Sequence, residues 1–380
     1  MSAAAPSAPP EVAWWVALAG LPGMGPARLR ALQGEGPGAE VWATVAGGRV
    51  DRWPAVGEAI GRRAEEVTAA WASAARRVDV DATWAAHAHL TVSLLGSGAH
   101  PRELDDDHDA PVVLFAAGEP EAVSGPTVAV VGTRRCTRAG AELAYDIGRT
   151  CAAAGVAVVS GLATGIDTAA HRGCLDAGPD AAPPVGVVGS GLDVVYPTRS
   201  RDLWAEVPRR GVLLSEYPLG TSPARWRFPA RNRLVAALAD VVVVVESGSR
   251  GGSLYTVDEA IDRDRTVMAV PGPVRSPASH GTNQLLVDGI QPLCAPEDVL
   301  VALGLAAPRP SERGPGDPRP RPSADGRRVL EALGWEPATI DVLAARTGLG
   351  LGRLAVALDE LDAAAWIHRD GGQIERKARP

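Results

Sequence analysis

The middle of the chain repeats one pattern of hydrophobic and polar positions: a short valine-rich run, a turn that contains glycine, and a helical stretch. The runs are continuous and do not alternate, which is typical of parallel strands buried on both faces. Helical stretches lie between most of them, for example residues 139–154, which Gly155 follows, so right-handed crossovers are expected. The pattern predicts an α/β fold: a Rossmann-like, doubly wound, mostly parallel sheet whose ligands lie at the carboxyl ends of its strands. The runs fall at residues 128–131, 156–159, 185–188, 212–214, 241–245 and 267–270.

Composition divides the chain into further parts. Residues 308–322 are rich in proline and arginine, a composition that builds neither helix nor sheet and is typical of a semi-extended linker. Near residues 75–81 helical patterning gives way to strand patterning. We predict a helical N-terminal domain over residues 1–80, the Rossmann-like core over residues 81–305, the linker over residues 306–323 and a small helical domain over residues 324–380.

The N-terminal domain contains a candidate helix-hairpin-helix turn. Gly23 and Gly25 precede Pro26, which opens a helical pattern. Such a turn can present backbone N–H groups to a phosphate of DNA. The alternative is a plain corner between two helices, and it is favoured because only Arg28 and Arg30 add positive charge nearby.

A glycine and two arginines follow the first valine-rich run. Gly132 permits a tight turn, and Thr133, Arg134 and Arg135 come directly after it. Thr137 stands where the N-cap of the next helix is expected. Backbone N–H groups and guanidinium groups at such a place form an anion site.

The second run ends in a turn that offers both a binding and a catalytic interpretation. Gly161 and Gly165 allow a ligand to approach the backbone closely, and Ser160 precedes them. Asp167 and His171 are four residues apart and share a helix face. A Ser–His–Asp arrangement is one interpretation. The structural alternative, in which Asp167 caps the helix and His171 packs locally, is favoured, so we expect no catalytic residues.

The arginine-rich segment over residues 225–234 is the most informative part of the sequence. Pro229 is expected to open a helix, which would place two of the arginines in its first turn, where cations oppose the helix dipole. Several cations at a helix start, where each is unfavourable, indicate a function. The function indicated here is the binding of an anion by both the helix start and the arginines. Guanidinium groups hold phosphates, and Trp226 and Phe228 could stack on bases. The alternative is that the arginines pair with surface carboxylates. The polar residues of the segment are Arg225, Arg227, Arg231, Asn232 and Arg233.

A further turn follows the most hydrophobic run. Gly251, Gly252 and Ser253 can form a nest of backbone N–H groups that leads into a helix. We assign them to the same phosphate-binding site as the two earlier turns and the arginine-rich segment.

Charge and composition exclude several classes of function. The formal net charge is −7, so a nucleic-acid site must be local rather than general. Lys377 is the only lysine, which excludes a P-loop ATPase, because that loop holds phosphates with a lysine. The first turn lacks the G-x-G-x-x-G fingerprint of NAD binding. The four cysteines are scattered, which favours reduced thiols in the cytosol and no metal or other cofactor. No apolar run approaches the ~20 residues that span a bilayer, so we expect no membrane partner.

Six segments, taken in order, resemble the DNA processing protein A (DprA, also called Smf) family. They read VAVVGTRRCTRAG, SGLATGIDTAAH, VVGSGLDVVYP, LLSEYPLGTSPARWRFPARNRLVAAL, VVVVVESGSRGGSLYTV and VMAVPG…GTNQLLVDG. The N-terminal domain resembles the family's small helical domain, which is SAM-like or helix-hairpin-helix-like, and residues 324–372 resemble its winged-helix domain. The segments depart from the family's pattern at His100-Pro101, at Ala139 and within residues 251–257.

The resemblance implies a cytoplasmic protein that binds single-stranded DNA, protects it and helps to load RecA recombinase during natural transformation and recombination. It also implies a homodimer and no enzymatic activity. The phosphate pocket would use the residues after the first two strands, and residues 231–233 would supply a further part. In the winged-helix domain the second helix would offer only Arg346 and Arg353, so sequence-specific readout of duplex DNA is not expected, and a dimer or partner surface is the alternative.

The main alternative function is an enzyme on a related core, a nucleotide phosphoribohydrolase of the lysine-decarboxylase-like type. Its glycine-glycine and T-x-x-E signature is loosely echoed by Gly251-Gly252 and residues 256–259. The spacing differs from that signature, and the arginine-rich segment and the winged helix would remain unexplained.

Overall fold

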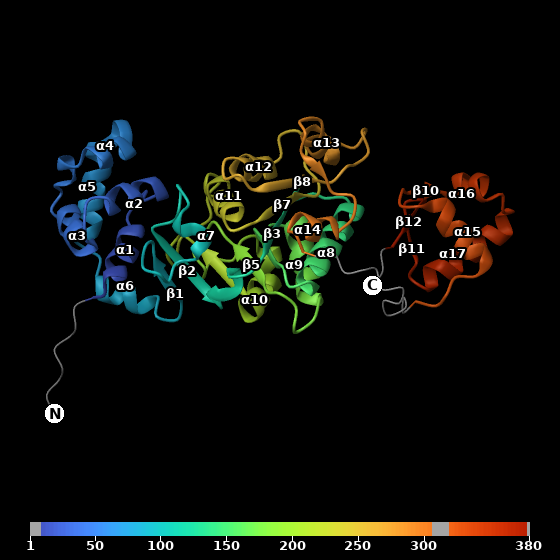
Figure 1. Cartoon of the computed structure of the whole chain (residues 1–380), viewed down its shortest axis with the longest axis horizontal. Coiled ribbons are helices and arrows are strands. Elements are labelled where there is room, and N and C mark those ends of the chain that lie inside the picture. Colours follow the sequence, from blue (N-terminus) through green and yellow to red (C-terminus); the bar gives the residue numbers. More distant parts are fainter. Residues whose placement is uncertain (1–8, 306–318, 378–380) are drawn as a thin grey trace, which may run out of the picture. The chain divides into compact units, whose positions relative to one another are not determined.

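The structure is a computed structural model, and it describes residues 9–305 and 319–377 (Figure 1). The chain divides into two compact units, Met1–Ala307 and Pro308–Pro380. Most of the predicted linker, residues 306–318, lies outside the described residues. Within the described ranges, no helix is both long enough and apolar enough to cross a bilayer.

The first unit begins with a helical part that has its own apolar centre. Trp15, Leu18 and Trp71 are buried there and belong to one hydrophobic cluster. The helices are α1 (Glu11–Ala19), α2 (Pro26–Gln33), α3 (Gly38–Ala46), α4 (Pro54–Ile60), α5 (Ala64–Ala75) and α6 (Val80–Ala86), with 3₁₀ turns at Val50–Arg52 and Gly61–Arg63.

The turn between α1 and α2 is the one that the sequence predicts as either a helix-hairpin-helix turn or a plain corner between two helices. Gly23 has a φ of 66°, a conformation that glycine adopts readily, and Pro26 is the first residue of α2. Arg28 donates from Nη1 to the Gly23 carbonyl oxygen at 2.8 Å, and Arg30 forms an ion pair with Asp109. Both cations near the turn therefore bind within the protein.

The rest of the first unit is built on one nine-stranded sheet with the spatial order β1-β2-β6-β5-β4-β3-β7-β8-β9. Strands β3 to β8 are the six predicted runs, and neighbours among them pair in parallel. From β3 the chain proceeds through β4 and β5 to β6, and then returns to β7 on the other side of β3. The topological switch point of this doubly wound sheet therefore lies between β3 and β7, where such folds bind ligands. The strands are β1 (Thr91–Leu94), β2 (Val113–Gly118), β3 (Thr127–Val131), β4 (Ala157–Ser160), β5 (Pro184–Val187), β6 (Val212–Ser215), β7 (Val241–Val244), β8 (Thr266–Ala269) and β9 (Gln291–Pro292).

Strands β1 and β2 extend the sheet beyond the predicted pattern. They pair with each other in antiparallel register, and β2 pairs with β6 in the same way. His100, at the position where the sequence departs from the family, is buried near β1, and its Nδ1 lies 3.1 Å from the Ser93 hydroxyl oxygen. A hydrogen bond to a strand thus satisfies one nitrogen of this buried side chain.

Helices cover both faces of the sheet (Figure 1). Val128 and Val130 of β3 point to the face that α8 and α9 cover, whereas Ala129 and Val131 point to the face of α11 and α12. A strand buried on both sides explains why the runs are continuously apolar. The helices are α7 (Arg102–Asp105), α8 (Arg138–Ala153), α9 (Ile166–Asp176), α10 (Arg201–Arg210), α11 (Arg227–Ala237), α12 (Ser253–Ile261), α13 (His280–Val287) and α14 (Asp298–Ala302), with 3₁₀ turns at Pro120–Val123, Thr198–Ser200 and Pro277–Ser279.

The second unit is a small winged helix. Its sheet has the order β10-β12-β11, and Leu330, Leu343, Leu354 and Leu358 lie in its core. The elements are α15 (Ala324–Leu333), β10 (Ala338–Thr339), α16 (Ile340–Thr347), α17 (Leu351–Ala363), β11 (Ile367–Asp370) and β12 (Gln373–Arg376).

The two cations that the sequence singled out in the winged helix have partners inside the unit. Arg353 donates through Nε and Nη2 to the two carboxylate oxygens of Asp325, at 2.8 and 2.6 Å. Arg346 donates from Nη1 to the Ala332 carbonyl oxygen at 3.1 Å. The two arginines lie on different helices, Arg346 on α16 and Arg353 on α17, and not on the single helix that the sequence predicted.

Candidate functional site

A pocket of about 650 Å³ opens at the carboxyl ends of β3, β4 and β7. Its lining comes from the turns after these strands and from the first halves of α11 and α12. This is the switch point of the sheet, where the fold places ligands. The predicted site residues that line it are Gly132, Thr133, Arg134, Gly161, Arg225, Arg231, Asn232, Gly251, Gly252 and Ser253.

The turn after β3 is fixed by Glu246, which lies two residues after the end of β7. The Glu246 carboxylate accepts hydrogen bonds from the backbone N–H of Thr137 at 2.8 Å and from its hydroxyl at 2.5 Å. Thr137 also caps α8, because its hydroxyl oxygen accepts from the Gly140 N–H at 3.0 Å. A Cβ on Gly132 would lie 2.6 Å from Ile166 and 2.8 Å from the Glu246 carbonyl oxygen, so the turn has room only for glycine. The predicted N-cap is confirmed.

The turn after β4 brings the backbone against an arginine. A Cβ on Gly161 would lie 1.9 Å from Nη1 of Arg231, so only glycine allows the guanidinium to lie here. Gly165 has a φ of 88°, and a Cβ on it would lie 2.4 Å from the Thr133 carbonyl oxygen. Gly165 therefore shapes the site without lining the pocket. Ser160 is fully buried, and its hydroxyl donates to the Val130 carbonyl oxygen at 2.6 Å.

Arg231 is a buried cation at the edge of this pocket. Its side chain is 5% exposed, and Nη1 donates to the Val187 carbonyl oxygen at 2.8 Å. Within residues 9–305 and 319–377 it forms no ion pair, and its buried Nε has no hydrogen-bond partner. Burial lowers the pKa of the guanidinium to about 10, so it remains charged at neutral pH. The Asp167 carboxylate on the same lining stabilises the charge of Arg231 from nearby but forms no ion pair with it. A buried cation that no carboxylate binds directly favours an anionic ligand.

Asp167 also lines the pocket, and the sequence analysis did not assign it to binding. Its Oδ2 accepts from the backbone N–H groups of Gly161 at 3.2 Å and Ala163 at 3.3 Å. The carboxylate thus holds the turn after β4 and does not cap α9, whose N-cap position is occupied by Gly165. Burial raises the pKa of Asp167. Its role in the turn is visible only once the turn is folded.

Aromatic side chains form the outer rim of the pocket. The Arg134 guanidinium lies over the ring of Phe228, 5.0 Å from its centroid, and the rings of Phe228 and Tyr196 are 5.3 Å apart. Tyr196 is 39% exposed and Tyr255 is 57% exposed. The sequence indicated Phe228 as a stacking residue but missed the two tyrosines. Tyr196 stands directly before the last residue of the segment VVGSGLDVVYP.

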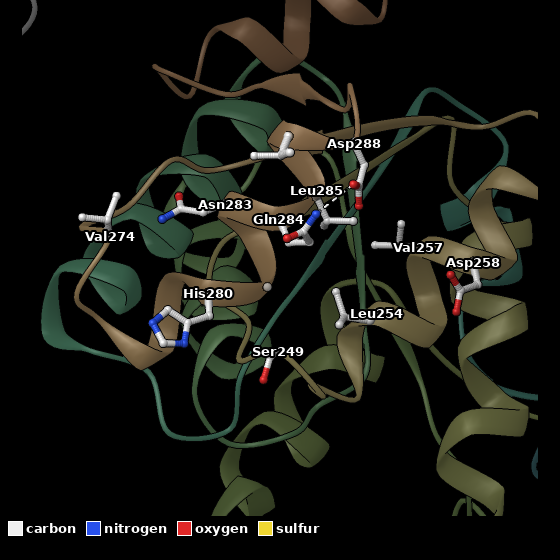
Figure 2. Close-up of a pocket in the computed structure, with 12 residues that line it drawn as sticks. Ser249, Leu254, Val257, Asp258, Val274, His280, Asn283, Gln284, Leu285 and Asp288 are labelled. Atoms are coloured by element: carbon white, nitrogen blue, oxygen red, sulfur yellow. Dashed lines mark hydrogen bonds between the residues drawn. The ribbon is translucent and has the colours of Figure 1, made fainter.

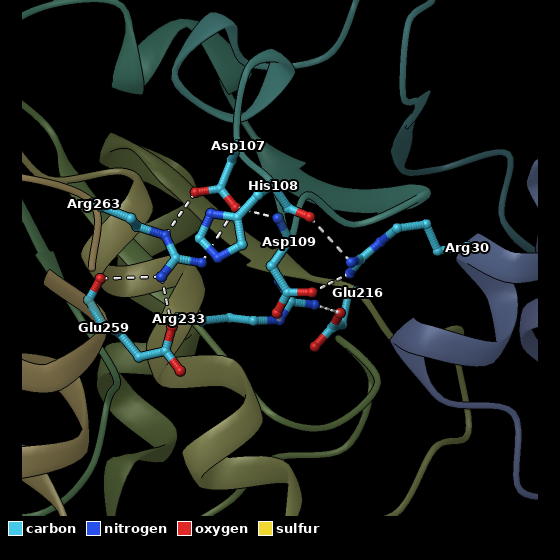
Figure 3. Close-up of polar contacts among 8 residues, drawn as sticks. All are labelled: Arg30, Asp107, His108, Asp109, Glu216, Arg233, Glu259 and Arg263. Atoms are coloured by element: carbon cyan, nitrogen blue, oxygen red, sulfur yellow. Dashed lines mark hydrogen bonds and ion pairs between the residues drawn. The ribbon is translucent and has the colours of Figure 1, made fainter. Parts of the chain in front are cut away.

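Three predicted arginines do not line the pocket. Helix α11 begins at Arg227, two residues before Pro229, so the prediction that Arg231 and Arg233 lie in its first turn is wrong. Arg233 is buried and forms ion pairs with Glu216 and Asp109 (Figure 3). For this residue the carboxylate-pairing alternative is correct.

The other two arginines lie beside the pocket. Arg227 lies over the rings of Tyr217 and Trp226, with centroid distances of 4.8 and 5.0 Å. Arg135 is exposed, and its backbone N–H donates to the Thr133 hydroxyl oxygen at 3.2 Å. Both remain near the turns that form the site, but neither guanidinium is part of its lining.

The catalytic interpretation of Ser160, Asp167 and His171 does not fit the geometry. The Ser160 hydroxyl donates to a backbone carbonyl, and the Asp167 carboxylate binds backbone N–H groups. His171 is fully buried, and burial lowers its pKa to about 4. A nucleophile hydrogen-bonded to a base is therefore not assembled from these residues. Across the described parts of the chain, no group of three histidine, cysteine or acidic residues could hold a metal ion.

Comparison with known proteins agrees with the geometry. Residues 91–304 match the family described as DNA recombination-mediator protein A. The chain belongs to this family. Residues 313–373 match the DprA winged helix domain.

Three relatives illustrate the similarity. The putative DNA processing protein DprA of Mycobacterium tuberculosis is 42% identical over 261 residues, which is 67% of this chain and 65% of that protein's length. The crystal structure of DprA from Streptococcus pneumoniae has a TM-score of 0.63 at 30% identity and covers 76% of this chain and 95% of its own. The structure of DprA from Helicobacter pylori has a TM-score of 0.51 at 30% identity and covers 57% and 96%.

Proposed function

We propose that this DprA-family chain binds single-stranded DNA in the pocket at the ends of β3, β4 and β7, protects it, and helps to load RecA recombinase on it in the cytoplasm, during natural transformation or recombination. The observation that carries the proposal is Arg231, a buried guanidinium that lines the pocket and forms no ion pair within the described residues. The H. pylori relative is a protein with a described single-stranded-DNA binding mode.

The pocket offers separate chemistry for the two parts of a nucleotide. Arg231 inside the pocket and the exposed Arg134 and Arg225 on its lining supply positive charge for phosphates. Backbone N–H groups at the start of α12 are a second type of phosphate ligand. The exposed rings of Tyr196 and Tyr255 are platforms on which unpaired bases can stack. Because paired bases are already stacked within a duplex, this arrangement favours single strands.

The proposed role is binding without catalysis, so the chain needs no cofactor. The nucleophile of the candidate triad would be the Ser160 hydroxyl. This hydroxyl is buried and donates its hydrogen bond to a backbone carbonyl oxygen. In the phosphoribohydrolase alternative, incubation with nucleoside monophosphates would release free base in proportion to the protein concentration.

A labelled oligonucleotide tests the proposal directly. We expect a single strand to bind at least tenfold more tightly than the matching duplex, as measured by fluorescence anisotropy. The affinity should fall steeply with salt, because each neutralised phosphate of a single strand contributes about 0.7 to the log–log slope. Equal affinity for both forms, or an affinity that salt does not change, would contradict the proposal.

The RecA step of the proposal rests on membership of the family. It is tested by the rate at which RecA covers an oligonucleotide already bound by a single-strand-binding protein. We propose that this chain increases that rate.

We also propose that two copies associate through an apolar groove beside α12 and α13 (Figure 2). The groove is about 610 Å³ in volume, and Leu254, Val257 and Leu285 line it together with polar side chains. Val274 and Val287 on its border are 81% and 79% exposed. A groove with exposed apolar side chains at its edge can bind the same edge of a second copy in a two-fold symmetric dimer.

Val287→Glu is expected to convert this dimer to a monomer, because the substitution places a charge in an apolar contact. Sedimentation velocity of the full chain at micromolar concentration measures the change. Val301→Glu is the matched control, since Val301 is 63% exposed on α14 and does not line the groove. A wild-type monomer, or a dimer that survives Val287→Glu, would contradict this interface.

A further inference from the structure

The turn between α7 and β2 is held by three arginines from distant parts of the chain: Arg30 of α2, Arg233 of α11 and Arg263 in the turn after α12 (Figure 3). Asp107 binds Arg263, with Nε–Oδ2 and Nη2–Oδ1 distances of 2.6 and 3.2 Å. Asp109 binds Arg233 of α11, with an Nε–Oδ2 distance of 3.0 Å, and also Arg30 of α2. We call this turn, residues 106–110, the clasp.

Two of the three carboxylates in the clasp, those of Asp107 and Asp109, bind arginines, and a hydrogen bond joins the two residues. The Asp109 backbone N–H donates to Asp107 Oδ1 at 2.7 Å. The side chains of Asp107 and Arg263 are 6% and 4% exposed, and that of Arg233 is 4% exposed. Buried charges of this kind are stable only while they stay paired. The Asp107–Arg263 pair is therefore a buried anchor of the clasp, whereas Asp109 and Arg30 are partly exposed, at 34% and 31%.

Helices α11 and α12 form one side of the DNA pocket. Arg233 belongs to α11, and Arg263 lies in the turn that follows α12. Helix α11 carries Arg233 on one side and Arg231 on another, because two residues turn a helix by about 200°. Asn232, between them, donates to the Gly252 carbonyl oxygen at 3.2 Å, which joins α11 to the start of α12. The arginine held by Asp107, Arg263, also binds Glu259 of α12 at 2.5 Å. The clasp thus contacts both pocket helices on the side away from the ligand.

The third arginine comes from the N-terminal helical part. Arg30 of α2 pairs with the Asp109 carboxylate, and its Nη1 donates to the His108 carbonyl oxygen at 3.2 Å. Asp109 and Glu216 both bind Arg233. If Arg30 is removed, Asp109 and Glu216 share Arg233 as their single buried cation. The Asp109 carboxylate, which helps to hold α11 in place through Arg233, then has one ion-pair partner instead of two.

We propose that Arg30 and Asp109 are positioning residues for the DNA pocket. Through them the N-terminal helical part fixes the position and rotation of α11, and therefore the direction in which Arg231 points. This inference rests on the proposed function of the pocket. It assigns the helical part a role in DNA binding without a DNA contact of its own.

The test compares variants of the full chain by fluorescence anisotropy with a labelled single strand over a range of salt concentrations. Arg30→Ala should weaken binding about threefold to tenfold, the size of coupling between residues in one network. The salt slope should stay unchanged, because Arg30 touches no phosphate, and Arg30→Lys should restore part of the affinity. Asp109→Asn should have a similar effect, and the double variant should be no weaker than either single variant.

Arg28→Ala is the matched control, because Arg28 lies on the same helix but binds only within the helical part, to the Gly23 and Ile60 carbonyl oxygens. Equal losses in Arg28→Ala and Arg30→Ala would overturn the inference, as would an unchanged affinity in Arg30→Ala. A salt slope smaller by about 0.7 would also overturn it, since Arg30 would then contact a phosphate directly. Arg231→Ala in the same series separates the two proposals: no effect there would remove the pocket itself, whereas a loss there without one in Arg30→Ala would remove only the positioning role.

Discussion

Arg231→Ala is expected to weaken the binding of single-stranded DNA about tenfold to a hundredfold. The guanidinium is buried at the edge of the pocket, where a hydrogen bond to a charged group is worth about 1.5–3 kcal/mol. Removal of the cation also takes away the charge that most lowers the pKa of Asp167, a carboxylate on the same lining. The affinity should fall for every oligonucleotide sequence alike, because a phosphate contact carries no sequence information.

The measurement is anisotropy at several salt concentrations, with thermal unfolding to show that the variant is folded. The log–log salt slope should become smaller by about 0.7, the value for one phosphate of a single strand. Arg231→Lys keeps the charge but loses the planar fork, and we expect an intermediate affinity. Arg172→Ala removes the same charge from an exposed position on α9 outside the pocket lining and should leave the affinity within about twofold. If Arg172→Ala and Arg231→Ala had the same effect, the pocket would not be the site.

The parts of the fold that depend on local pattern could be predicted from the sequence. Continuous valine runs predicted strands β3 to β8, because a strand buried on both faces needs apolar residues throughout. Thr137 was predicted as an N-cap because a hydroxyl directly before a helical stretch commonly accepts a hydrogen bond from a backbone N–H of the first turn. The glycines at the strand ends were predicted for the same kind of local reason, and Gly132 and Gly161 do stand where a Cβ would collide.

The parts that depend on distant partners could not be predicted. Glu246 fixes the turn around Thr137, although the two residues are 109 positions apart in the sequence. Strand β2 joins the sheet by antiparallel pairing with β6. It lacks the strand–turn–helix pattern by which the parallel strands were predicted. Which arginine of the segment lies at the pocket depends on the carboxylates that surround α11. Glu216 and Asp109, both distant in sequence, pair with Arg233 on one side of the helix, and Arg231 on another side lines the pocket.

Arg233→Ala is expected to destabilise the first unit by about 3–5 kcal/mol, because it leaves a buried carboxylate without its partner. Glu216 and Arg233 are each 4% exposed, and burial already raises the pKa of Glu216. In the variant this pKa should rise further, so the loss of stability should be smallest below pH 4.5, where the carboxyl is neutral in both states, and should grow as the pH increases towards the raised pKa. Urea unfolding at several pH values measures the effect.

The double variant Arg233→Met with Glu216→Gln shows whether the pair or the charge alone carries the stability. Removal of both partners of a buried ion pair costs much less than removal of one, because no unpaired charge remains. We therefore expect the double variant to regain most of the stability and to lose the dependence on pH. If its DNA affinity remained low while its stability returned, Arg233 would act on the pocket through the rotation of α11 as well as through folding. A single variant Arg233→Ala as stable as the wild type at neutral pH would contradict the buried pair altogether.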